Sequence, residues 1–488
     1  MTKGGLNSAM DLSHLLSDEA KRRKPSPIKT TMSYFEDPEI IFLGAGMPPA
    51  ELFPLKSLSI EIPEMLSSKG DEGSVTGKLC KLAKDQENPK DIPLARALQY
   101  GNSRGQRELV SFLKEHIVKF HQIPYSDWDV LITAGSTQAW DASLRLFCNP
   151  GDSVLLESWT YSSSVEAAEA QGMYCVGVEI DGHGVVPEKL EWLLQNWDDL
   201  HPGRSLPKLL YVIPTGQNPM GVTLADERKP LIYNIIQKYD MVLIEDDPYY
   251  FLQMDPYKPK AERSASSLEE STNYWMDHHE EFAKSLTRSF LEWDVEGRVL
   301  RLESTSKTIA PGCRIGWIVA PKPLLDQYWN LQEVSIQASC GFVQAIFCGI
   351  LNRWGQEGYI AWLITLRYQY TIKRNHCLDC CLEYLPLDFV RLIPPLAGMF
   401  FMVSFDASRH PDFESSFGKD PQKVEAHIYG KLVKNGVLLA CGSWFKVNPS
   451  SNKNTTISFR GTFAAVDLLN MENGIKLLGS TLRKEFAL

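Results

Sequence analysis

Short apolar runs alternate with amphipathic stretches between about residues 92 and 320 of the chain. The runs span 130–133, 153–156, 209–213, 241–244, 299–302 and 315–319. Most of them lack polar alternation, which is typical of strands that are covered on both faces. Stretches with helical periodicity, such as 187–197 and 226–238, lie between most of the runs. This order predicts an α/β fold in which helices flank a mostly parallel sheet.

The pattern changes on both sides of this region, and it predicts a large domain, a small domain and an arm. We expect an N-terminal arm that begins the small domain (1–50), a loop-rich connection (51–95), a large domain with an insertion near 256–285 (96–325), and a long interdomain helix followed by the C-terminal small domain (326–488). The charged segment 68–92 is expected to be a surface loop. After residue 325, long helical stretches and short alternating runs are typical of an α+β domain.

Composition and charge argue against several classes of protein. The 488 residues carry a net charge of -10, which argues against a nucleic-acid partner. No apolar run approaches the length of about 18 residues that a membrane span requires, and the N-terminal residues lack an apolar signal core. The ten cysteines are scattered except around Cys377 and Cys380, where no second pair completes a metal site. We therefore expect a cytoplasmic protein with free thiols, no membrane contact and no metal.

One lysine has an unusual place in this pattern. Lys307 follows the apolar run 298–303 directly, in a hydroxyl-rich turn that contains Ser304 and Ser306. Because removing an ammonium group from water is costly, a lysine between two buried strands needs a reason. Covalent chemistry is one such reason, since a lysine amine forms a Schiff base with a carbonyl, including that of pyridoxal phosphate. Taken alone, Lys307 is explained more simply as a solvated turn residue.

Other strand-like runs also end in chemically useful residues. Ser136 and Thr137 follow a glycine after the run 130–133, where they form either an anion seat or an ordinary helix N-cap. Tyr161 could cover a flat ring or belong to the core. Asn218 lies in an Asn-Pro-x-Gly sequence, which is a turn signature in its own right, and its amide could instead face a phenolic oxygen.

Three acidic residues, Glu245, Asp246 and Asp247, follow the run 241–244. Acids at the end of a buried strand are unusual unless they pair with a cation. A pyridinium nitrogen would be such a cation, because a carboxylate beside it keeps the ring protonated and able to accept electrons.

In this order, each after its own strand, these motifs resemble those of the class I/II aminotransferases, the fold-type-I enzymes that depend on pyridoxal phosphate. The segments 24–29, 245–252 and 397–401 are similar to the fungal aromatic and 2-aminoadipate aminotransferases and to the kynurenine/aminoadipate aminotransferases. The chain departs from that pattern at Gly44-Ala45-Gly46, Trp159 and Cys441. These positions shape the substrate pocket, so they affect the expected specificity more than the chemistry.

The resemblance implies a role for each matching residue. Lys307 would form the Schiff base and carry the proton, Asp246 would face the pyridine nitrogen, Asn218 and Tyr249 would bond the ring oxygen, and Tyr161 would stack on the ring. Phosphate would be held by Ser136, Thr137, Ser304, Ser306, Arg314 and, from the neighbouring subunit of a homodimer, Tyr100. Arg460 would bind the substrate α-carboxylate with Asn218, near Gly46. Lys29 would meet a distal carboxylate.

The resemblance also implies a reaction. An amino group would pass from an aromatic amino acid (Phe, Tyr or Trp), or from 2-aminoadipate or kynurenine, to a 2-oxo acid such as 2-oxoglutarate, with ping-pong kinetics. A cysteine-conjugate β-lyase of the same fold would share every residue named above. A regulator that binds pyridoxal phosphate without catalysis is a further alternative, against which the intact Lys307 speaks.

Overall fold

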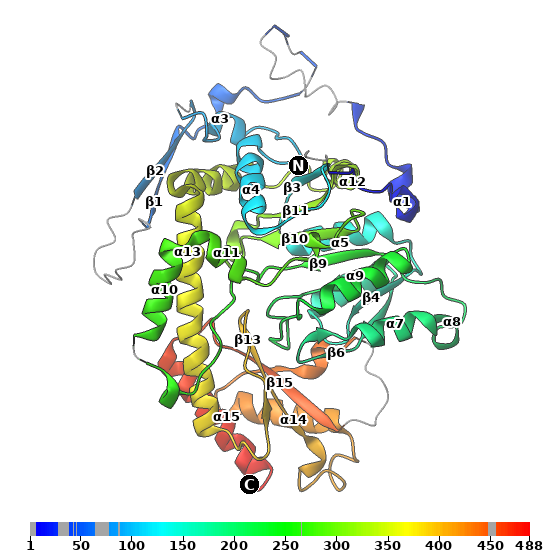
Figure 1. The fold of residues 1–488 in the computed structure, drawn as a ribbon, viewed down its shortest axis with the longest axis vertical. Helices are drawn as coiled ribbons and strands as arrows, with labels where there is room; N and C mark the ends of the chain where they lie inside the picture. The colour runs from blue at the N-terminus through cyan, green and yellow to red at the C-terminus, as the bar shows by residue number, and fades with distance from the viewer. Residues whose placement is uncertain are drawn as a thin grey trace, which may run out of the picture.

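A seven-stranded sheet forms the centre of the molecule (Figure 1). The computed structural model describes residues 6–27, 39–41, 43–44, 46–63, 78–85, 88–264, 266–447 and 455–488. The strands of the sheet are β3 (Trp128–Thr133), β4 (Ser153–Glu157), β5 (Tyr174–Val178), β8 (Leu209–Val212), β9 (Val242–Asp246), β10 (Val299–Ser304) and β11 (Gly316–Pro321). They lie in the order β3-β11-β10-β9-β8-β4-β5. β11 runs antiparallel to the other six strands, which share one direction, and this mostly parallel sheet confirms the predicted α/β fold.

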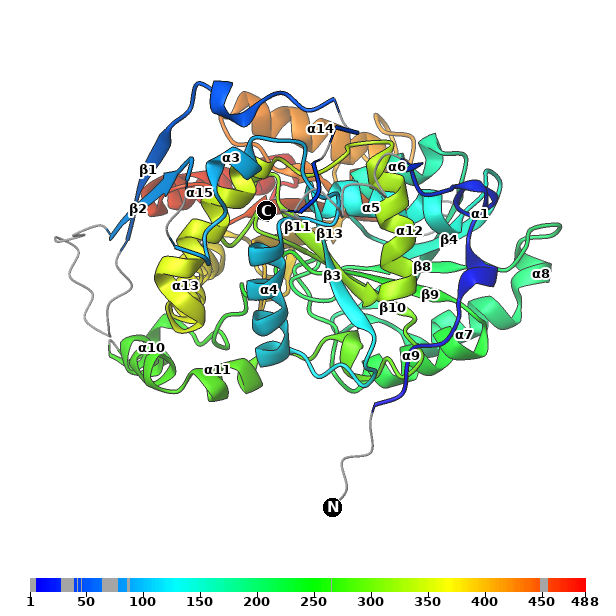
Figure 2. The ribbon, with the colours of Figure 1, turned by 90° about the horizontal axis from the view of Figure 1, so that it is seen from above.

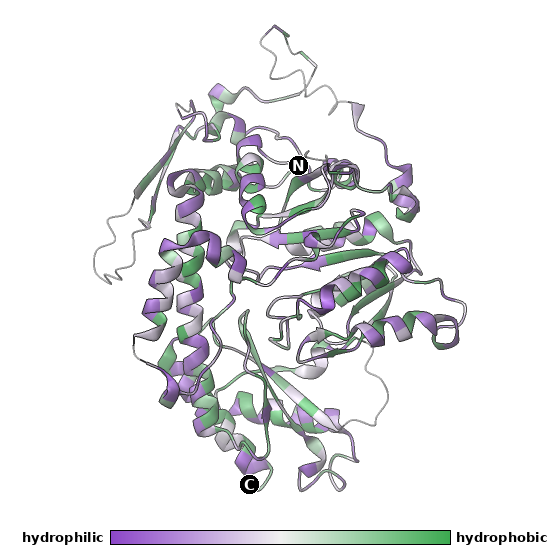
Figure 3. Cartoon of the chain, in the orientation of Figure 1, coloured by the Kyte–Doolittle hydropathy of each residue, from purple (hydrophilic) through white to green (hydrophobic). Residues whose placement is uncertain are grey.

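Helices cover both faces of this sheet (Figure 2). The core on one face includes α4 (Arg107–Phe120), α7 (Pro187–Gln195), α9 (Arg228–Lys238) and part of α13 (Gly341–Tyr384). The core on the other face includes α1 (Asp18–Arg22), α5 (Ser136–Phe147) and α12 (Lys322–Glu333). Successive strand residues point to opposite faces, so Leu243 joins the first core and Ile244 the second. Burial on both faces explains why the strands are mainly apolar (Figure 3).

A smaller sheet lies beyond the large one along α13 (Figure 1). Its strands are β12 (Arg391–Leu392), β13 (Phe400–Asp406), β14 (Ala440–Cys441) and β15 (Thr456–Thr462), paired antiparallel in the order β12-β13-β15-β14. A third core joins this sheet to α14 (Pro421–Lys434), α15 (Leu468–Glu485) and the end of α13. The long helix α13 contains one non-helical residue, Gly355, with φ 66°, which lies between the two predicted helical stretches.

One prediction about local structure is wrong, and one strand of the large sheet was missed. The expected loop 68–92 contains β2 (Lys78–Ala83), which pairs antiparallel with β1 (Ser57–Ile62). Cys80 and Leu82 are fully buried and lie against Gly349 of α13, whereas Leu79 and Lys81, which alternate with them, are exposed. The strand β5, at the edge of the large sheet, was not predicted from its short apolar run.

The remaining elements are short. The predicted insertion near 256–285 contains α10 (Ser267–Asp277) and α11 (His279–Ser285), at the edge of the molecule away from α1 and α12 (Figure 2). The others are α3 (Leu94–Ala97), α6 (Ser162–Ala170), α8 (Trp197–Leu200), β6 (Ile180–Asp181), β7 (Gly184–Val185), and the 3-10 turns η1 (Ser13–Leu15), η3 (Ala50–Leu52), η4 (Lys260–Glu262), η5 (Phe290–Glu292), η6 (Pro311–Cys313), η7 (Ala407–Arg409) and η8 (Gly442–Phe445). Among the described helices, none combines the length and the apolar character needed to cross a bilayer.

Candidate active site

Lys307 lies in a closed turn after β10. The backbone N–H of Thr305 donates to the carbonyl of Ile315 over 3.0 Å, and the carbonyl of Thr305 accepts from Ile309 N over 2.8 Å. Burial, with a smaller contribution from Arg314, lowers the pKa of the half-buried Lys307 amine. A lysine with a lowered pKa has a larger neutral fraction, which is the nucleophilic and basic form.

The N-terminus of α5 forms an anion cradle together with Arg314. Gly135 precedes the helix with φ 99°, and a Cβ at this position would lie 2.6 Å from Arg314 Nη2. That nitrogen donates to the carbonyl of Ala134 over 2.8 Å, which holds the guanidinium beside Ser136. Free N–H groups at a helix start and a guanidinium both favour a phosphate. Only glycine leaves room for the guanidinium here.

Two further hydroxyl groups lie at the end of β10. Ser304 Oγ donates to Ser306 Oγ over 2.8 Å and accepts from Ser306 N over 3.1 Å. Thr137 is exposed on the first turn of α5. The hydroxyl residues predicted to hold phosphate thus flank Lys307 or begin α5.

Strand alternation separates the three acids at the end of β9. Glu245 and Asp247 face the α4 side of the sheet, where Arg301 Nη1 lies 3.1 Å from Glu245 Oε1 and 3.2 Å from Asp247 Oδ2. Arg301 is fully buried and also pairs with Glu303 over 2.8 Å. Asp246 faces the α5 side and makes no ion pair with a described residue. The sequence predicted a cation for these acids, and for two of them that cation is Arg301.

Asp246 has one carboxylate oxygen in use and one free. Its Oδ2 accepts from Tyr211 Oη over 2.6 Å, whereas its buried Oδ1 has no hydrogen-bond partner in the described chain. Burial raises the pKa of Asp246 to about 6, and the facing hydroxyls of Tyr211 and Ser136 oppose this shift. A buried carboxylate with an unused oxygen fits a protonated pyridine nitrogen. Together with the anion cradle, it shows that these residues fit pyridoxal phosphate.

Arg460 of β15 comes from the small sheet and reaches the loop after β8. Its Nη1 donates to Asn218 Oδ1 over 2.7 Å. The guanidinium carbon lies 4.4 Å from the ring centre of Phe400 and 4.5 Å from that of Phe445. Burial lowers the pKa of Arg460, and it makes no ion pair with a described residue. A desolvated guanidinium between two aromatic rings is suited to bind a carboxylate.

Two tyrosines lie beside this arginine. Burial and the nearby Asp246 carboxylate raise the pKa of Tyr249 far above neutral pH, while Arg460 and a hydrogen bond with Asn218 oppose the shift. The hydroxyl of Tyr249 is therefore protonated at neutral pH. Tyr161 is half-buried at the start of α6.

Three of the predicted site residues are not brought into this cluster. Tyr100 is 58% exposed, and no contact with another candidate residue joins it to the site. Gly46 is exposed, and nothing lies within 4 Å of where its Cβ would be. Lys29 lies outside the described residues.

Sequence reasoning missed several residues that support the site. Tyr211 and Arg301 lie inside apolar strands, and a lone polar residue within such a strand is the signal that could have revealed them. In the sequence, Gln217 is noticeable only as a member of the turn that also contains Asn218. Its Nε2 donates to Glu157 Oε2 over 3.0 Å, and the same oxygen accepts from Ile213 N over 3.1 Å. Glu157 thereby holds the loop that carries Asn218.

Replacement of Glu157 by glutamine is expected to reduce the pH dependence of stability. Burial raises the pKa of Glu157 from 4.5 to about 8, so the folded state binds this proton more tightly than the unfolded state. The resulting stabilisation is complete below pH 4.5 and is lost as pH rises through about 8. Between pH 5 and 8 the variant should gain about 2 kcal/mol in free energy of unfolding relative to the wild type.

Urea denaturation at several pH values measures this difference. Glu179→Gln is the control, because Glu179 is exposed and pairs only loosely with Lys189 over 3.6 Å. Equal pH slopes in wild type and Glu157→Gln would show that Glu157 is ionised in the folded protein.

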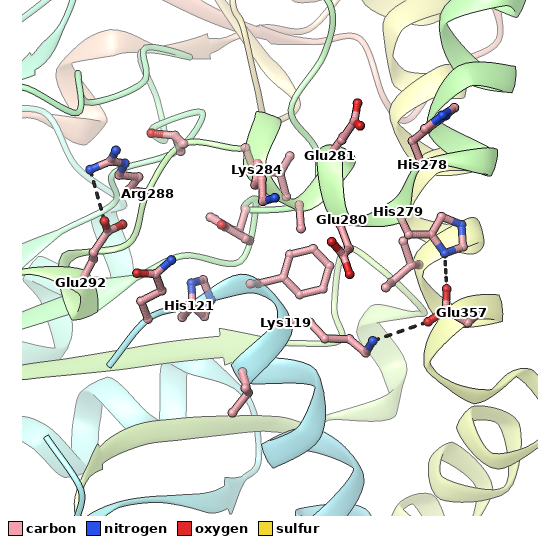
Figure 4. A pocket seen from close by; sticks show the side chains of 18 of the residues that line it. Lys119, His121, His278, His279, Glu280, Glu281, Lys284, Arg288, Glu292 and Glu357 are labelled. Carbon is pink, nitrogen blue, oxygen red and sulfur yellow. Dashed lines mark hydrogen bonds and ion pairs between the residues drawn. The ribbon is translucent and has the colours of Figure 1, made fainter. Parts of the chain in front are cut away.

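A cavity of about 890 Å³ lies elsewhere, beside α4, α11 and α13 (Figure 4). Five of its charged or titratable groups pair with one another: Lys119 and His279 with Glu357 over 3.5 and 2.5 Å, and Arg288 with Glu292 over 3.2 Å. None of the predicted site residues lines it. We therefore assign the candidate chemistry to the strand ends and not to this cavity.

Comparison with known proteins agrees with this geometry. The family model of aminotransferase class I and II matches residues 80–478. An aromatic amino acid aminotransferase of Schizosaccharomyces pombe is 39% identical over 98% of both chains, and an L-tyrosine:2-oxoglutarate aminotransferase of Tapinella panuoides is 34% identical over 98% of this chain and 97% of its own. The solved structure of aminotransferase Aro8 from Candida albicans is 43% identical, with a TM-score of 0.90 over 99% of this chain and 100% of that one. The matched family model and the full-length similarity show that this chain belongs to the class I and II aminotransferases.

Proposed function

We propose that this enzyme transfers the amino group of an aromatic amino acid to a 2-oxo acid such as 2-oxoglutarate, with pyridoxal 5′-phosphate as its cofactor. The observation that carries the proposal is the Asp246 carboxylate, which is buried, has a free Oδ1 and makes no ion pair with a described residue. An unpaired carboxylate is costly to bury, so we expect Asp246 to bind a cationic ligand. Lys307, with its lowered pKa, follows the neighbouring strand β10.

Each residue of the site would have its own role in the reaction. Bound pyridoxal phosphate would supply an aldehyde for a covalent bond to an amine and a protonated ring that accepts electrons from the substrate. The Lys307 amine would bind that aldehyde and move the substrate proton, while Asp246 would keep the ring nitrogen protonated. Asn218 and Tyr249 would bond the ring oxygen. Tyr161 would cover the ring.

The phosphate would lie at the start of α5. Ser136 and Thr137 would bind it with backbone N–H groups and hydroxyls. Arg314 would neutralise its charge. Ser304 and Ser306 would donate from the opposite side.

The substrate preference follows from the surroundings of Arg460. This guanidinium would bind the α-carboxylate, and the rings of Phe400 and Phe445 beside it would favour an aromatic side chain. The names of the Schizosaccharomyces pombe and Tapinella panuoides relatives support aromatic donors. Binding of a distal carboxylate by Lys29, as 2-aminoadipate would need, stays a prediction.

We also propose a homodimer and a cytoplasmic location. The exposed Tyr100 is free to reach the phosphate of a neighbouring subunit, which would complete a site that a single chain leaves without this residue. The ten cysteines are all free, as is usual in a reducing compartment. Both statements go beyond family membership and rest on these residues.

A panel of amino donors with 2-oxoglutarate tests the proposed reaction. Phe, Tyr, Trp, 2-aminoadipate, kynurenine, aspartate and alanine are compared by the rate of glutamate formation. We expect kcat/KM for Phe and Tyr to exceed that for aspartate and alanine at least about tenfold, because contact of an aromatic side chain with the aromatic residues beside Arg460 favours the bound state. Double-reciprocal plots at several 2-oxoglutarate concentrations should be parallel.

A β-lyase would give a different result in the same assay. With a cysteine conjugate as the only substrate, it would release pyruvate and ammonia without 2-oxoglutarate. Such release at a rate above that of glutamate formation from Phe would overturn the proposal. So would an equal kcat/KM for aspartate and Phe.

A further inference from the structure

We propose that Trp362, on α13, is a positioning residue that holds the turn of Lys307 in place through the carbonyl of Thr308. This inference rests on the proposed function, in which the Lys307 amine bonds to pyridoxal phosphate. Its indole Nε1–H donates to the carbonyl oxygen of Thr308 over 2.6 Å. Thr308 follows Lys307 directly, so this bond acts on the backbone of the lysine and not on its side chain.

At its beginning the turn is fixed by Thr305, and further along Ile309 packs against the large core. Thr305 donates to the carbonyl of Ile315 through its N–H over 3.0 Å and its Oγ1 over 3.1 Å. The N–H groups of Ile309 and Ala310 close the turn on the carbonyl of Thr305 itself. Lys307 thus lies between two anchors, the bonds of Thr305 to Ile315 and the bond that Thr308 accepts from Trp362 of α13. Loss of either anchor gives the intervening backbone more freedom.

A fixed backbone conformation matters here because the Lys307 amine must reach the same position in every catalytic cycle. A reacting group that is held near its productive geometry avoids the entropic cost of finding it. The indole comes from the long helix that joins the two sheets, so the orientation of the lysine depends on the packing of that helix. The half-buried ring also packs against the large core.

A second tryptophan on the same helix provides a matched control. The ring of Trp354 stacks on that of Trp362, with centroids 5.7 Å apart and planes at 27°. Its Nε1–H donates to a different backbone carbonyl, that of Pro63, over 3.1 Å. Trp362→Phe and Trp354→Phe therefore remove the same kind of bond from adjacent rings. Only the first bond reaches the turn of Lys307.

The experiment measures how fast Lys307 bonds to added pyridoxal phosphate. In this step the neutral amine attacks the aldehyde carbon, a carbon–nitrogen double bond replaces the carbon–oxygen bond, and the oxygen leaves as water with the two amine protons. Full-length enzyme freed of cofactor is mixed with pyridoxal phosphate in a stopped-flow instrument, and absorbance reports the bond. Equilibrium dialysis with pyridoxamine phosphate, which has no aldehyde, reports phosphate and ring binding alone.

We expect Trp362→Phe to slow formation of the covalent bond about tenfold, with affinity for pyridoxamine phosphate within about twofold of the wild type. Trp354→Phe should leave both quantities within about twofold. A merely structural role of Trp362 would weaken both measurements together. That result, or equal rates in the two variants, would overturn the inference.

Two further measurements distinguish failure of the role inferred for Trp362 from failure of the proposed function and from failure of the variant to fold. If the wild type forms no covalent bond, or Lys307→Arg forms it equally fast, the proposed function fails and not only the role of Trp362. If Trp362→Phe does not fold, β-(3-benzothienyl)alanine at position 362 exchanges the N–H for sulfur at nearly constant size. The same tenfold difference, about that of one lost hydrogen bond, is expected for that variant, and wild-type rates would overturn the inference.

Discussion

Replacement of Lys307 by arginine is expected to lower the rate of transamination about 10⁴-fold or more. The amine of Lys307 is half-buried, and its pKa is lowered by burial and by Arg314, so part of it is neutral and able to accept a proton. A guanidinium at this position would stay protonated at every accessible pH and could neither bond to an aldehyde nor act as a base. Glutamate formation from Phe and 2-oxoglutarate measures the loss.

A second lysine controls for the general effect of exchanging a lysine for an arginine. Lys322 is exposed at the start of α12, after the antiparallel strand β11, and Lys322→Arg should retain the wild-type rate. The melting temperature of Lys307→Arg should remain within about 3 °C of the wild type, because the long side chain still reaches solvent from the turn. Transamination by Lys307→Arg above about one hundredth of the wild-type rate would contradict the role assigned to this amine.

The sequence was informative where a residue type is unusual for its local pattern. Lys307 follows an apolar run directly, and three acids follow another. Such residues carry a desolvation penalty that packing alone does not explain. Because parallel strands end at one edge of a sheet, the order of motifs also predicted that they would converge. The fold could be predicted for the same reason, since strands buried on both faces lack polar alternation.

Partners that come from distant segments could not be predicted. Nothing local pairs Arg301 with Glu245, because β9 and β10 become neighbours only in the sheet. The bond between Trp362 and Thr308 joins residues 54 positions apart. The strand β2 escaped detection because Leu79 is apolar yet 63% exposed, which breaks the apolar/polar alternation, and because its two buried residues are packed by the distant helix α13. Tertiary packing, and not local propensity, decides such cases.

The charged residues at the strand ends differ between the two faces of the large sheet. This difference predicts a second large effect, on the rate of transamination. On one face, Arg301 binds the carboxylates of Glu245, Asp247 and Glu303. On the other face, Asp246 accepts a hydrogen bond from the Tyr211 hydroxyl on one oxygen and makes no ion pair with a described residue. Two acids on opposite faces should therefore respond differently to neutralisation. Glu303 should matter for stability and Asp246 for the reaction.

Asp246→Asn is expected to lower transamination about 10³-fold or more. An amide cannot keep a pyridine nitrogen protonated, so the ring would lose its ability to accept electrons from the substrate. Stability should not fall, because burial already raises the pKa of Asp246 to about 6 and thus works against the charged form at neutral pH. The rate of glutamate formation and urea denaturation at pH 7 measure the two quantities.

Glu303→Gln is the counterpart on the other face. Arg301 lowers the pKa of Glu303 to about 2 in spite of burial, so its stabilisation is present above the unfolded value of 4.5 and is lost as pH falls through about 2. The variant should lose about 3 kcal/mol in free energy of unfolding at pH 7, a loss that shrinks below pH 4, while transamination stays within about tenfold of the wild type. If Asp246→Asn instead lost stability and kept its rate, Asp246 would be a structural acid like Glu303, and the cationic ligand inferred for its free oxygen would have to be abandoned.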